Sequence, residues 1–418
     1  MDQQATRVAP VLRYARAATK IMMTGSPIHR AWRAALLATA LLVPGAPLEA
    51  DAQPADLACD QQPGNRFFWL ERAFCDLPTN GPERANGVIL WNHGISGTTQ
   101  SWMAPAPPVF RLLQARGWDV IMLKRHHGAE GDSVLYRTVQ RTLQEAAALK
   151  KSGYRKVVLA GQSFGGYVTL EAIDTSPDID AVVAMAPGVR SSSPTGRLDA
   201  SVTDRILQRA KVGRVALVFP KDDVLFGHVV RGESADAILS RRSLPYLLVD
   251  ETSGISGHGG GSGGRFALRY GLCLADFLAA AAPPPARFTC PPVADEWLVV
   301  RELLSPLPAA RPSFVREASA FPAPVGSLLG LRWALLGDSV VLVAPVDGGS
   351  GQLRLMYRST SFRGGVFDAT VKDGVVRAVL SNKATVTLKP EGEGTINWTA
   401  ADGSRSLDAP LVRGRDDL

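Results

Sequence analysis

The sequence predicts an α/β fold, in which a mostly parallel sheet carries helices on both faces, followed by a small antiparallel all-β domain. Between residues 86 and 281, short apolar β-rich runs alternate with amphipathic stretches, a pattern typical of a parallel sheet that is buried on both faces. From about residue 328 the runs become short, and turn signals such as Lys372-Asp-Gly374 separate them. Such spacing favours an antiparallel meander, sandwich or barrel.

Composition sets the broad class of the protein. The 418 residues are enough for roughly two or three domains, and 46% hydrophobic with 20% charged residues exclude a mostly disordered chain. The 46 Lys and Arg exceed the 39 Asp and Glu by a net charge of +7, without a basic run that marks a nucleic-acid surface. We therefore expect no nucleic-acid partner. No HxxEH-like spacing occurs, so we expect no metal site. We also expect no other cofactor.

Residues 1–52 resemble a targeting segment rather than part of a folded domain. Arg30 and Arg33 precede the apolar run 34–43, and Ala50-Asp-Ala52 provides the small residues of a cleavage site. We interpret 1–52 as an N-terminal extension with a secretory signal peptide, followed by an N-terminal segment at 53–85. The apolar run is too short to span a bilayer, although a buried helix or an uncleaved anchor are alternatives. The prediction is an exported protein, periplasmic or extracellular, without a membrane anchor after cleavage.

A series of apolar runs predicts the strands of the parallel sheet, and residues 134–151 predict its longest helix. Because right-handed crossovers connect such strands, their carboxyl ends should meet at one edge of the sheet, where active sites form. The proline-rich residues 282–327 predict a semi-rigid linker to the C-terminal domain at 328–418. The expected strands are 87–92, 119–124, 156–161, 181–186, 214–219 and 246–250.

The third of these strands runs directly into the motif Gly161-Gln-Ser163-Phe-Gly165, and a helical stretch follows. A turn this tight between strand and helix leaves room only for glycine two residues on either side of the serine. The serine hydroxyl would then project above the sheet edge at a helix N-terminus. We therefore take Ser163 as the candidate nucleophile; an ordinary Gly/Ser turn is the alternative.

A serine hydroxyl needs a base, and that base needs an orienting acid. Only His228 and His258 follow Ser163, and His258 lies in a glycine-rich loop directly after the strand 246–250. His228 comes too soon after the candidate acids and is expected to begin a helix. The strand 214–219 ends in Asp222 and Asp223, either of which can be the acid.

The tetrahedral intermediate of acyl transfer needs two backbone donors. One is the N–H of Phe164, directly after the serine. The other is expected from the loop that follows the first strand, in which Ile95 is our candidate and Ser96 the next choice. His93 precedes the serine, so we expect it to brace this loop rather than to act as a base. His126 and His127 could line the pocket rim or form part of a polar loop.

Export would permit disulfides between the four cysteines of the chain. Three pairings are possible in principle. We predict the pairing of sequence neighbours, Cys59 with Cys75 and Cys273 with Cys290. The alternative for Cys273, which lies in an apolar helix, is a buried free thiol.

These motifs together resemble the α/β-hydrolase superfamily over about residues 86–281. The resemblance is carried by the strand ending in His93-Gly94, the run Gly161-Gln-Ser-Phe-Gly-Gly-Tyr167, and His258 between two glycines. It is similar to dienelactone hydrolase-like enzymes and to the catalytic domain of prolyl oligopeptidases. The resemblance implies an α/β-hydrolase fold and a triad of Ser163, Asp223 and His258, and it favours Asp223 because Pro220 takes the place of the Gly in the superfamily's G-x-x-D segment. Dienelactone hydrolases proper use cysteine, and the propeller of the oligopeptidases has no room in this chain.

The expected function is that of an exported serine hydrolase, which cleaves a small-molecule or polymeric carboxylic ester through an acyl-enzyme. The short segment 187–213 leaves no room for a large lid and predicts an open site. A peptidase or an acyltransferase would use the same residues. A different class is a non-catalytic binding protein that works through its C-terminal domain, whose Trp333, Tyr357 and Trp398 could be exposed for binding or could fill the core.

Overall fold

The computed structural model describes most of the chain after residue 56. The predicted signal segment 1–52 lies outside the described residues, and so do Ser96, His127 and His228. The described residues are 57–59, 61, 64–95, 101–126, 134–174, 176–188, 200–226, 230–281, 285–305, 328–347, 352–361 and 364–415.

An eight-stranded sheet forms the first part of the fold, in the order β1-β3-β2-β4-β5-β6-β7-β8. All neighbours are parallel except β1, which runs antiparallel to β3 at one edge. The predicted strands are present, with ends that differ by one residue or less. The strands are β1 (Phe68–Arg72), β2 (Gly87–Asn92), β3 (Trp118–Arg125), β4 (Val157–Gln162), β5 (Ala181–Met185), β6 (Arg214–Val218), β7 (Tyr246–Val249) and β8 (Arg287–Phe288).

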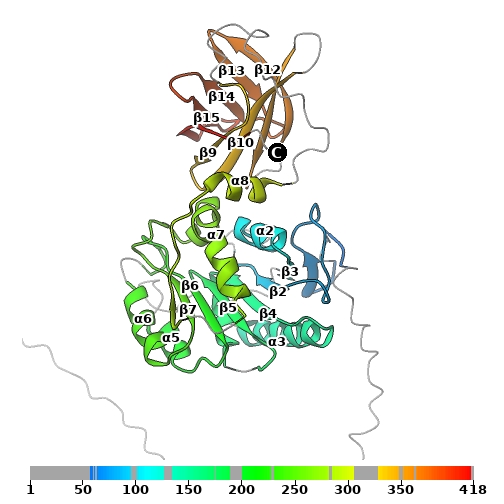
Figure 1. The fold of residues 1–418 in the computed structure, drawn as a ribbon. Helices are drawn as coiled ribbons and strands as arrows, with labels where there is room; N and C mark the ends of the chain where they lie inside the picture. Colours follow the sequence, from blue (N-terminus) through cyan, green and yellow to red (C-terminus); the bar gives the residue numbers. More distant parts are fainter. Residues whose placement is uncertain are drawn as a thin grey trace, which may run out of the picture. The chain divides into compact units, whose positions relative to one another are not determined.

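Helices cover both faces of this sheet (Figure 1). Neighbouring residues of a strand point to opposite faces, so Ile89 and Trp91 of β2 enter one apolar cluster while Val88 and Leu90 enter the other. The α/β part of the predicted fold class is confirmed. The helices are α2 (Pro108–Ala115), α3 (Leu135–Lys151), α4 (Phe164–Glu171), α5 (Ala200–Leu207), α6 (Gly232–Arg241), α7 (Gly264–Ala279) and α8 (Glu296–Leu304), with 3₁₀ turns η2 (Ser101–Met103) and η5 (Gly260–Ser262).

Three elements lie where the sequence predicted none. Strand β1 falls in the expected N-terminal segment 53–85, and β8 and α8 fall in the expected linker 282–327. The linker prediction is therefore wrong for the first part of this range. Helix α8 begins where Asp295 accepts the backbone N–H of Leu298 as an N-cap, 3.2 Å away. Its apolar residues are buried, so the prolines before it mark turns rather than an extended spacer.

A nine-stranded antiparallel sheet forms the C-terminal domain, in the order β16-β15-β14-β13-β12-β11-β10-β9-β17 (Figure 1). The strands at the two ends of this order, β16 and β17, are separated only by Leu411. The sheet therefore closes on itself, which corresponds to the barrel among the predicted alternatives of meander, sandwich and barrel. The strands are β9 (Arg332–Leu336), β10 (Ser339–Asp347), β11 (Leu353–Ser359), β12 (Gly365–Lys372), β13 (Val375–Val379), β14 (Thr385–Lys389), β15 (Thr395–Thr399), β16 (Ser406–Pro410) and β17 (Val412–Arg413).

Strand β10 is buried on both of its faces. Val341 and Val343 point into the apolar interior of the C-terminal sheet. Val340 and Leu342 point the other way and belong to the same apolar cluster as α7 and α8. The eight-stranded sheet and the C-terminal sheet thus share one core. Of the three aromatic residues considered for binding, Trp333 lies in the shared cluster, Tyr357 lies in the interior, and Trp398 packs against that interior.

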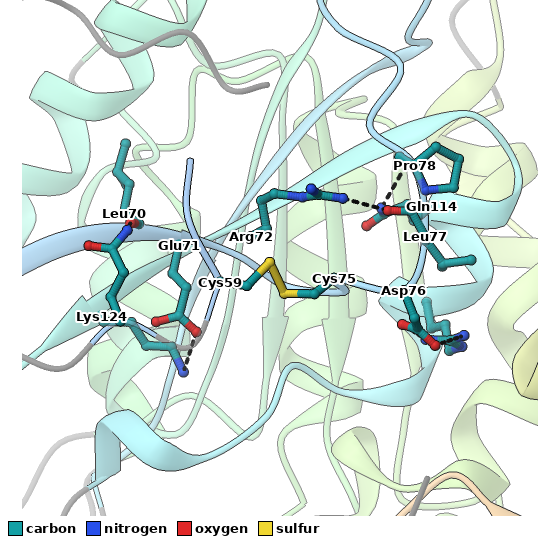
Figure 2. The surroundings of a disulfide bond; sticks show 12 residues. Cys59, Leu70, Glu71, Arg72, Cys75, Asp76, Leu77, Pro78, Gln114 and Lys124 are labelled. Atoms are coloured by element: carbon teal, nitrogen blue, oxygen red, sulfur yellow. Dashed lines mark hydrogen bonds and ion pairs between the residues drawn. A yellow bond between two sulfur atoms is a disulfide. The ribbon is translucent and has the colours of Figure 1, made fainter. Parts of the chain in front are cut away.

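Two disulfides are present, and they are the predicted ones: Cys59–Cys75 and Cys273–Cys290. Cys273 is therefore not a free thiol. Figure 2 shows the first disulfide between the chain before β1 and the turn after it. Next to it, Asp76 forms an ion pair with Arg111 of α2, 2.8 Å away. The disulfide thereby fixes the N-terminal segment to the edge of the sheet.

In the part of the chain that the structure describes, no helix is both long and apolar enough to cross a membrane.

Candidate active site

Ser163 occupies a strained turn between β4 and α4. Its backbone has φ 54° and ψ −121°, a combination that costs an L-residue energy and persists only where the surroundings enforce it. A Cβ on Gly161 would lie 2.2 Å from the carbonyl oxygen of Gly165, and a Cβ on Gly165 would lie 2.0 Å from that of Asn92. Both glycines are thus required by close backbone approach, which explains their spacing around the serine.

The backbone of Ser163 is anchored to the neighbouring strand. Its N–H donates to the carbonyl of Met185 at 2.9 Å, and its carbonyl accepts from the N–H groups of Tyr167 and Gly188 at 2.9 and 3.1 Å. The side chain makes no capping hydrogen bond to α4. The hydroxyl therefore does not cap the helix that follows it.

His258 and Asp223 form a hydrogen-bonded pair on the loops that follow β7 and β6. Nδ1 of His258 lies 3.0 Å from Oδ1 of Asp223, and the same carboxylate oxygen accepts the N–H of Leu225 at 3.0 Å. The side chain of Asp223 is buried, whereas that of Asp222 is exposed. Of the two aspartates considered from the sequence, Asp223 is the one that contacts the imidazole.

The opposite side of the imidazole is buried and unengaged. Nε2 of His258 has no hydrogen-bond partner among the described residues. If Nδ1 carries the proton donated to Asp223, Nε2 has its lone pair available to accept one. Gln162, the residue before Ser163, donates to the carbonyl of His258 at 3.2 Å. The histidine loop is thus tied directly to the turn that holds the serine.

The pKa of Asp223 is lowered although the group is buried. Burial by itself raises the pKa, but the hydrogen bond and charge of His258, the N–H of Leu225 and the charge of Arg231 together outweigh it. Asp223 is therefore a carboxylate at neutral pH. A carboxylate in this position stabilises an imidazolium and holds Nδ1 as the protonated nitrogen.

The glycine-rich loop that carries His258 is packed rather than free. The backbone of Lys221 exchanges hydrogen bonds with Ile255 and Gly257, at 2.8 and 2.7 Å, so the loops after β6 and β7 run side by side. Farther along, a Cβ on Gly264 would lie 2.8 Å from the carbonyl oxygen of Asp338. The end of the loop is thus pressed against the turn between β9 and β10 of the C-terminal domain.

The residues predicted to bind the oxyanion lie next to the serine. Phe164 is the first residue of α4, so its N–H has no acceptor within the helix. Gly94 approaches so closely that a Cβ there would lie 3.2 Å from Cβ of Ser163. The side chain of Ile95, the next residue, packs in a small apolar cluster with Phe164. Ser96, the other candidate donor, lies outside the described residues.

His93 is buried behind this loop. Its Nε2 accepts the backbone N–H of Arg125 at 3.1 Å, and its Nδ1 lies 2.7 Å from the carbonyl oxygen of Gly94. Burial, followed by the charge of Arg125, lowers the pKa of His93 well below 6.5. It has the contacts of a residue that braces the loop. His126 makes an edge contact with Phe67, with 6.4 Å between the ring centroids.

Sequence reasoning missed one charged residue at this site. Arg231 is 3% exposed, and its guanidinium lies 3.3 Å from Oδ2 of Asp223. No motif surrounds it, because it comes from the start of α6 and only the fold brings it to the acid. Among the described residues, no cluster of His, Cys, Asp and Glu could hold a metal ion. The segments 96–100, 127–133 and 189–199, which follow β2, β3 and β5, lie outside the described residues.

Comparison with known proteins finds one family whose model matches the part of the chain that carries most of this site. Residues 88–254, which contain Ser163 and Asp223, match the Alpha/beta hydrolase family. The resemblance inferred from the sequence is thereby confirmed. No curated protein sequence matches the chain.

Several solved structures are similar to part of this chain. The esterase Pf2001 from Pyrococcus furiosus is 13% identical with a TM-score of 0.36, covering 53% of this chain and 96% of that one. A CIB-like hydrolase from Thermoplasma acidophilum is 18% identical with a TM-score of 0.36, covering 51% and 92%. Est1E from Butyrivibrio proteoclasticus is 15% identical with a TM-score of 0.34, covering 53% and 94%.

Proposed function

We propose that this chain, whose residues 88–254 match the alpha/beta hydrolase family, is an exported serine hydrolase that cleaves a carboxylic ester. One observation carries the proposal. The strained turn at Ser163, the His258–Asp223 pair on neighbouring loops, and the tie from Gln162 to His258 occur together at one edge of the sheet. A positioned serine, a base and an acid that orients the base are the parts that nucleophilic catalysis needs.

In the proposed reaction, Nε2 of His258 takes the proton of the Ser163 hydroxyl as the oxygen attacks the ester carbonyl carbon. The oxygen of the tetrahedral intermediate accepts hydrogen bonds from the N–H groups of Phe164 and Ile95. The imidazolium then gives its proton to the departing alcohol, which leaves an acyl-enzyme on Ser163. Water, deprotonated by His258, attacks the acyl group, and the acid is released as Ser163 regains its proton.

The choice of a small-molecule or polymeric ester follows from the short segment 187–213, which contains α5 and leaves little chain for a lid. Export is supported by the two disulfides, because such bonds persist in oxidising compartments. The leading segment 1–52, with its cleavage pattern, supports the same proposal from the sequence. The C-terminal domain gives the binding-protein alternative little support, since Trp333 and Tyr357 are buried.

Labelling of the purified protein with a fluorophosphonate probe tests the activated serine. We expect one label per chain, located on Ser163, and its loss in Ser163→Ala. Ser201→Ala, which removes a hydroxyl from the surface of α5, is the matched control and should label normally. Absence of labelling in the folded protein would overturn the proposal.

Substrate tests then separate the reactions that share this machinery. Hydrolysis of 4-nitrophenyl acetate without hydrolysis of aminoacyl amides identifies an esterase. Faster cleavage of the amides would show a peptidase. Capture of the acyl group by hydroxylamine in preference to water would point to an acyltransferase.

A further inference from the structure

A buried cation joins the loops on which the proposed catalytic residues lie. Arg231 immediately precedes α6 and has only 3% of its surface exposed. Its guanidinium donates to Oδ2 of Asp223 at 3.3 Å and to the carbonyl oxygen of Pro187 at 3.1 Å. A carboxylate and a carbonyl on different strand-end loops therefore share one planar donor group.

Two aromatic rings hold this guanidinium. Its central carbon lies 4.3 Å from the ring centroid of Phe219 and 3.5 Å from that of Phe226. Contacts of this kind attract a cation and fix its plane. Burial lowers the pKa of Arg231 to about 10, so the group is still charged at neutral pH.

The backbone of Arg231 is held as firmly as its side chain. The carboxylate of Glu251, on the loop that leads from β7 to His258, accepts the N–H of Arg231 at 2.7 Å and that of Gly232 at 3.2 Å. The loops after β5, β6 and β7 thus all contact one residue, through Pro187, Asp223 and Glu251. The first of these loops also reaches the serine, because Gly188 donates to the carbonyl of Ser163.

We infer that Arg231 is a positioning residue for the proposed hydrolytic reaction: it fixes the carboxylate of Asp223 so that Oδ1 faces His258. The inference rests on the proposed function and deepens it. Oδ1 already receives two hydrogen bonds, from Nδ1 of His258 and from the N–H of Leu225. The guanidinium of Arg231 donates a hydrogen bond to Oδ2. Without that bond, the carboxylate can rotate about its Cβ–Cγ bond.

An arginine suits this position better than a neutral donor. A buried carboxylate with an unmatched charge is costly, and a dehydrated cation beside it offsets that cost. The planar fork also allows one side chain to reach two acceptors at once, which a lysine ammonium cannot do in the same geometry.

The test compares Arg231→Met and Arg231→Lys with a matched control, Arg287→Met. Arg231 and Arg287 both line a cavity of about 510 Å³. The ion-pair partner of Arg287, however, is Asp236, 3.0 Å away. We expect Arg231→Met to lower kcat about 10- to 100-fold with little change in KM, because the acid is misplaced and substrate contacts are not. Arg231→Lys should fall between this variant and the unmodified protein, and Arg287→Met should keep full activity.

Two further measurements separate positioning from a general loss of structure. If Arg231 acts through Asp223, then Arg231→Met made in the Asp223→Asn background should lower kcat by less than about twofold. In proton NMR, the downfield signal of the His258 Nδ1 proton, assigned by its loss in Asp223→Asn, should be shifted or lost in Arg231→Met. It should persist in Arg231→Lys and in Arg287→Met.

The outcomes distinguish the inference from the proposed function. An active protein whose Arg231→Met variant keeps both its kcat and its downfield signal overturns the inference, and so does an equal loss of kcat in both backgrounds. A protein that hydrolyses no ester but shows the expected NMR changes overturns the proposed function and leaves the positioning role in place. If Arg231→Met does not fold, Arg231→Lys decides through the same signal and the same rate comparison.

Discussion

Oδ1 of Asp223 lies 3.0 Å from Nδ1 of His258, while the adjacent Asp222 has an exposed side chain and a backbone φ of 56°. The positive φ of Asp222 turns the chain between the two residues. As a result, two neighbouring carboxylates of the same chemistry have different surroundings, one buried beside an imidazole and one in solvent.

This difference predicts unequal effects of the same substitution. Asp223→Asn should lower kcat by about 10⁴, because the amide cannot hold the imidazole in the required tautomer. Asp222→Asn should change kcat by less than about threefold, as expected for a surface position. Steady-state kinetics of both variants on 4-nitrophenyl acetate, with matched circular dichroism spectra, measure this directly. Similar losses in the two variants would contradict the assignment of the acid.

Gly264 should be sensitive to a single added methyl group. A Cβ there would lie 2.8 Å from the carbonyl oxygen of Asp338, from Oγ1 of Thr360 and from the N of Val340. We expect Gly264→Ala to lower the free energy of unfolding by about 1–3 kcal/mol through overpacking. Urea denaturation measures the change.

The same loop provides the control for that experiment. Nothing lies within 4 Å of a Cβ on Gly259, and its φ is −87°. Gly259→Ala should therefore leave stability within about 0.5 kcal/mol of the unmodified protein. Equal destabilisation by both variants would show that the loop is sensitive for a reason other than the contact with Asp338.

His93 predicts a loss of stability in mild acid. Burial, and then the charge of Arg125, hold the pKa of His93 well below 6.5 in the folded protein, whereas the unfolded chain binds a proton near that value. As the pH falls below about 6.5, the unfolded state takes up a proton that the folded state refuses, and stability falls by up to ~1.4 kcal/mol per pH unit. The stability is fully present above this range and is lost as the pH falls through it.

Denaturation curves between pH 8 and pH 5 test this. His93→Gln cannot titrate, so its free energy of unfolding should depend less steeply on pH over this interval, whatever its value at pH 8. Parallel pH dependences of the variant and the unmodified protein would assign the acid sensitivity to other groups.

The disulfide between Cys273 and Cys290 should contribute to stability through the loop it closes. The two residues are 17 apart in sequence, and the bond joins α7 to the chain after β8. Replacing both by alanine should lower the free energy of unfolding by about 3 kcal/mol, chiefly by freeing the unfolded chain. Thermal unfolding with and without reductant measures it, and reductant should have a smaller effect on the variant than on the unmodified protein. An unchanged melting temperature would mean that the packing of α7 alone holds this segment.

Local sequence patterns predicted the central part of the fold well. The strands β2 to β7 are mostly apolar runs, and such runs indicate buried parallel strands even when the neighbouring strands are unknown. The turn at Ser163 is also predictable from a local pattern. Glycines two residues before and after a serine, directly after a strand, indicate a tight turn between that strand and a helix. Cys59 and Cys75 were paired from their spacing.

The features that sequence could not predict depend on long-range contacts. Strand β1 has an ordinary mixed sequence and becomes a strand only because β3 offers an open edge. Helix α8 lies among prolines, and its burial under the C-terminal sheet overrides the appearance of a linker. Arg231 gives no local sign of its role, because Phe219, Phe226 and Asp223 surround it only after folding.

The shared core of the two sheets limits how the C-terminal domain can be exchanged between proteins. Val340 and Leu342 of β10 lie in the same apolar cluster as Trp297 and Phe266 from α8 and α7. A chimera that joins residues 328–418 to another catalytic domain would therefore leave apolar surface exposed on both partners, unless α7 and α8 were transferred with it. The C-terminal domain therefore cannot be transferred alone. The smallest part that can be transferred as one folded unit also includes α7 and α8, the last two helices of the domain that carries Ser163.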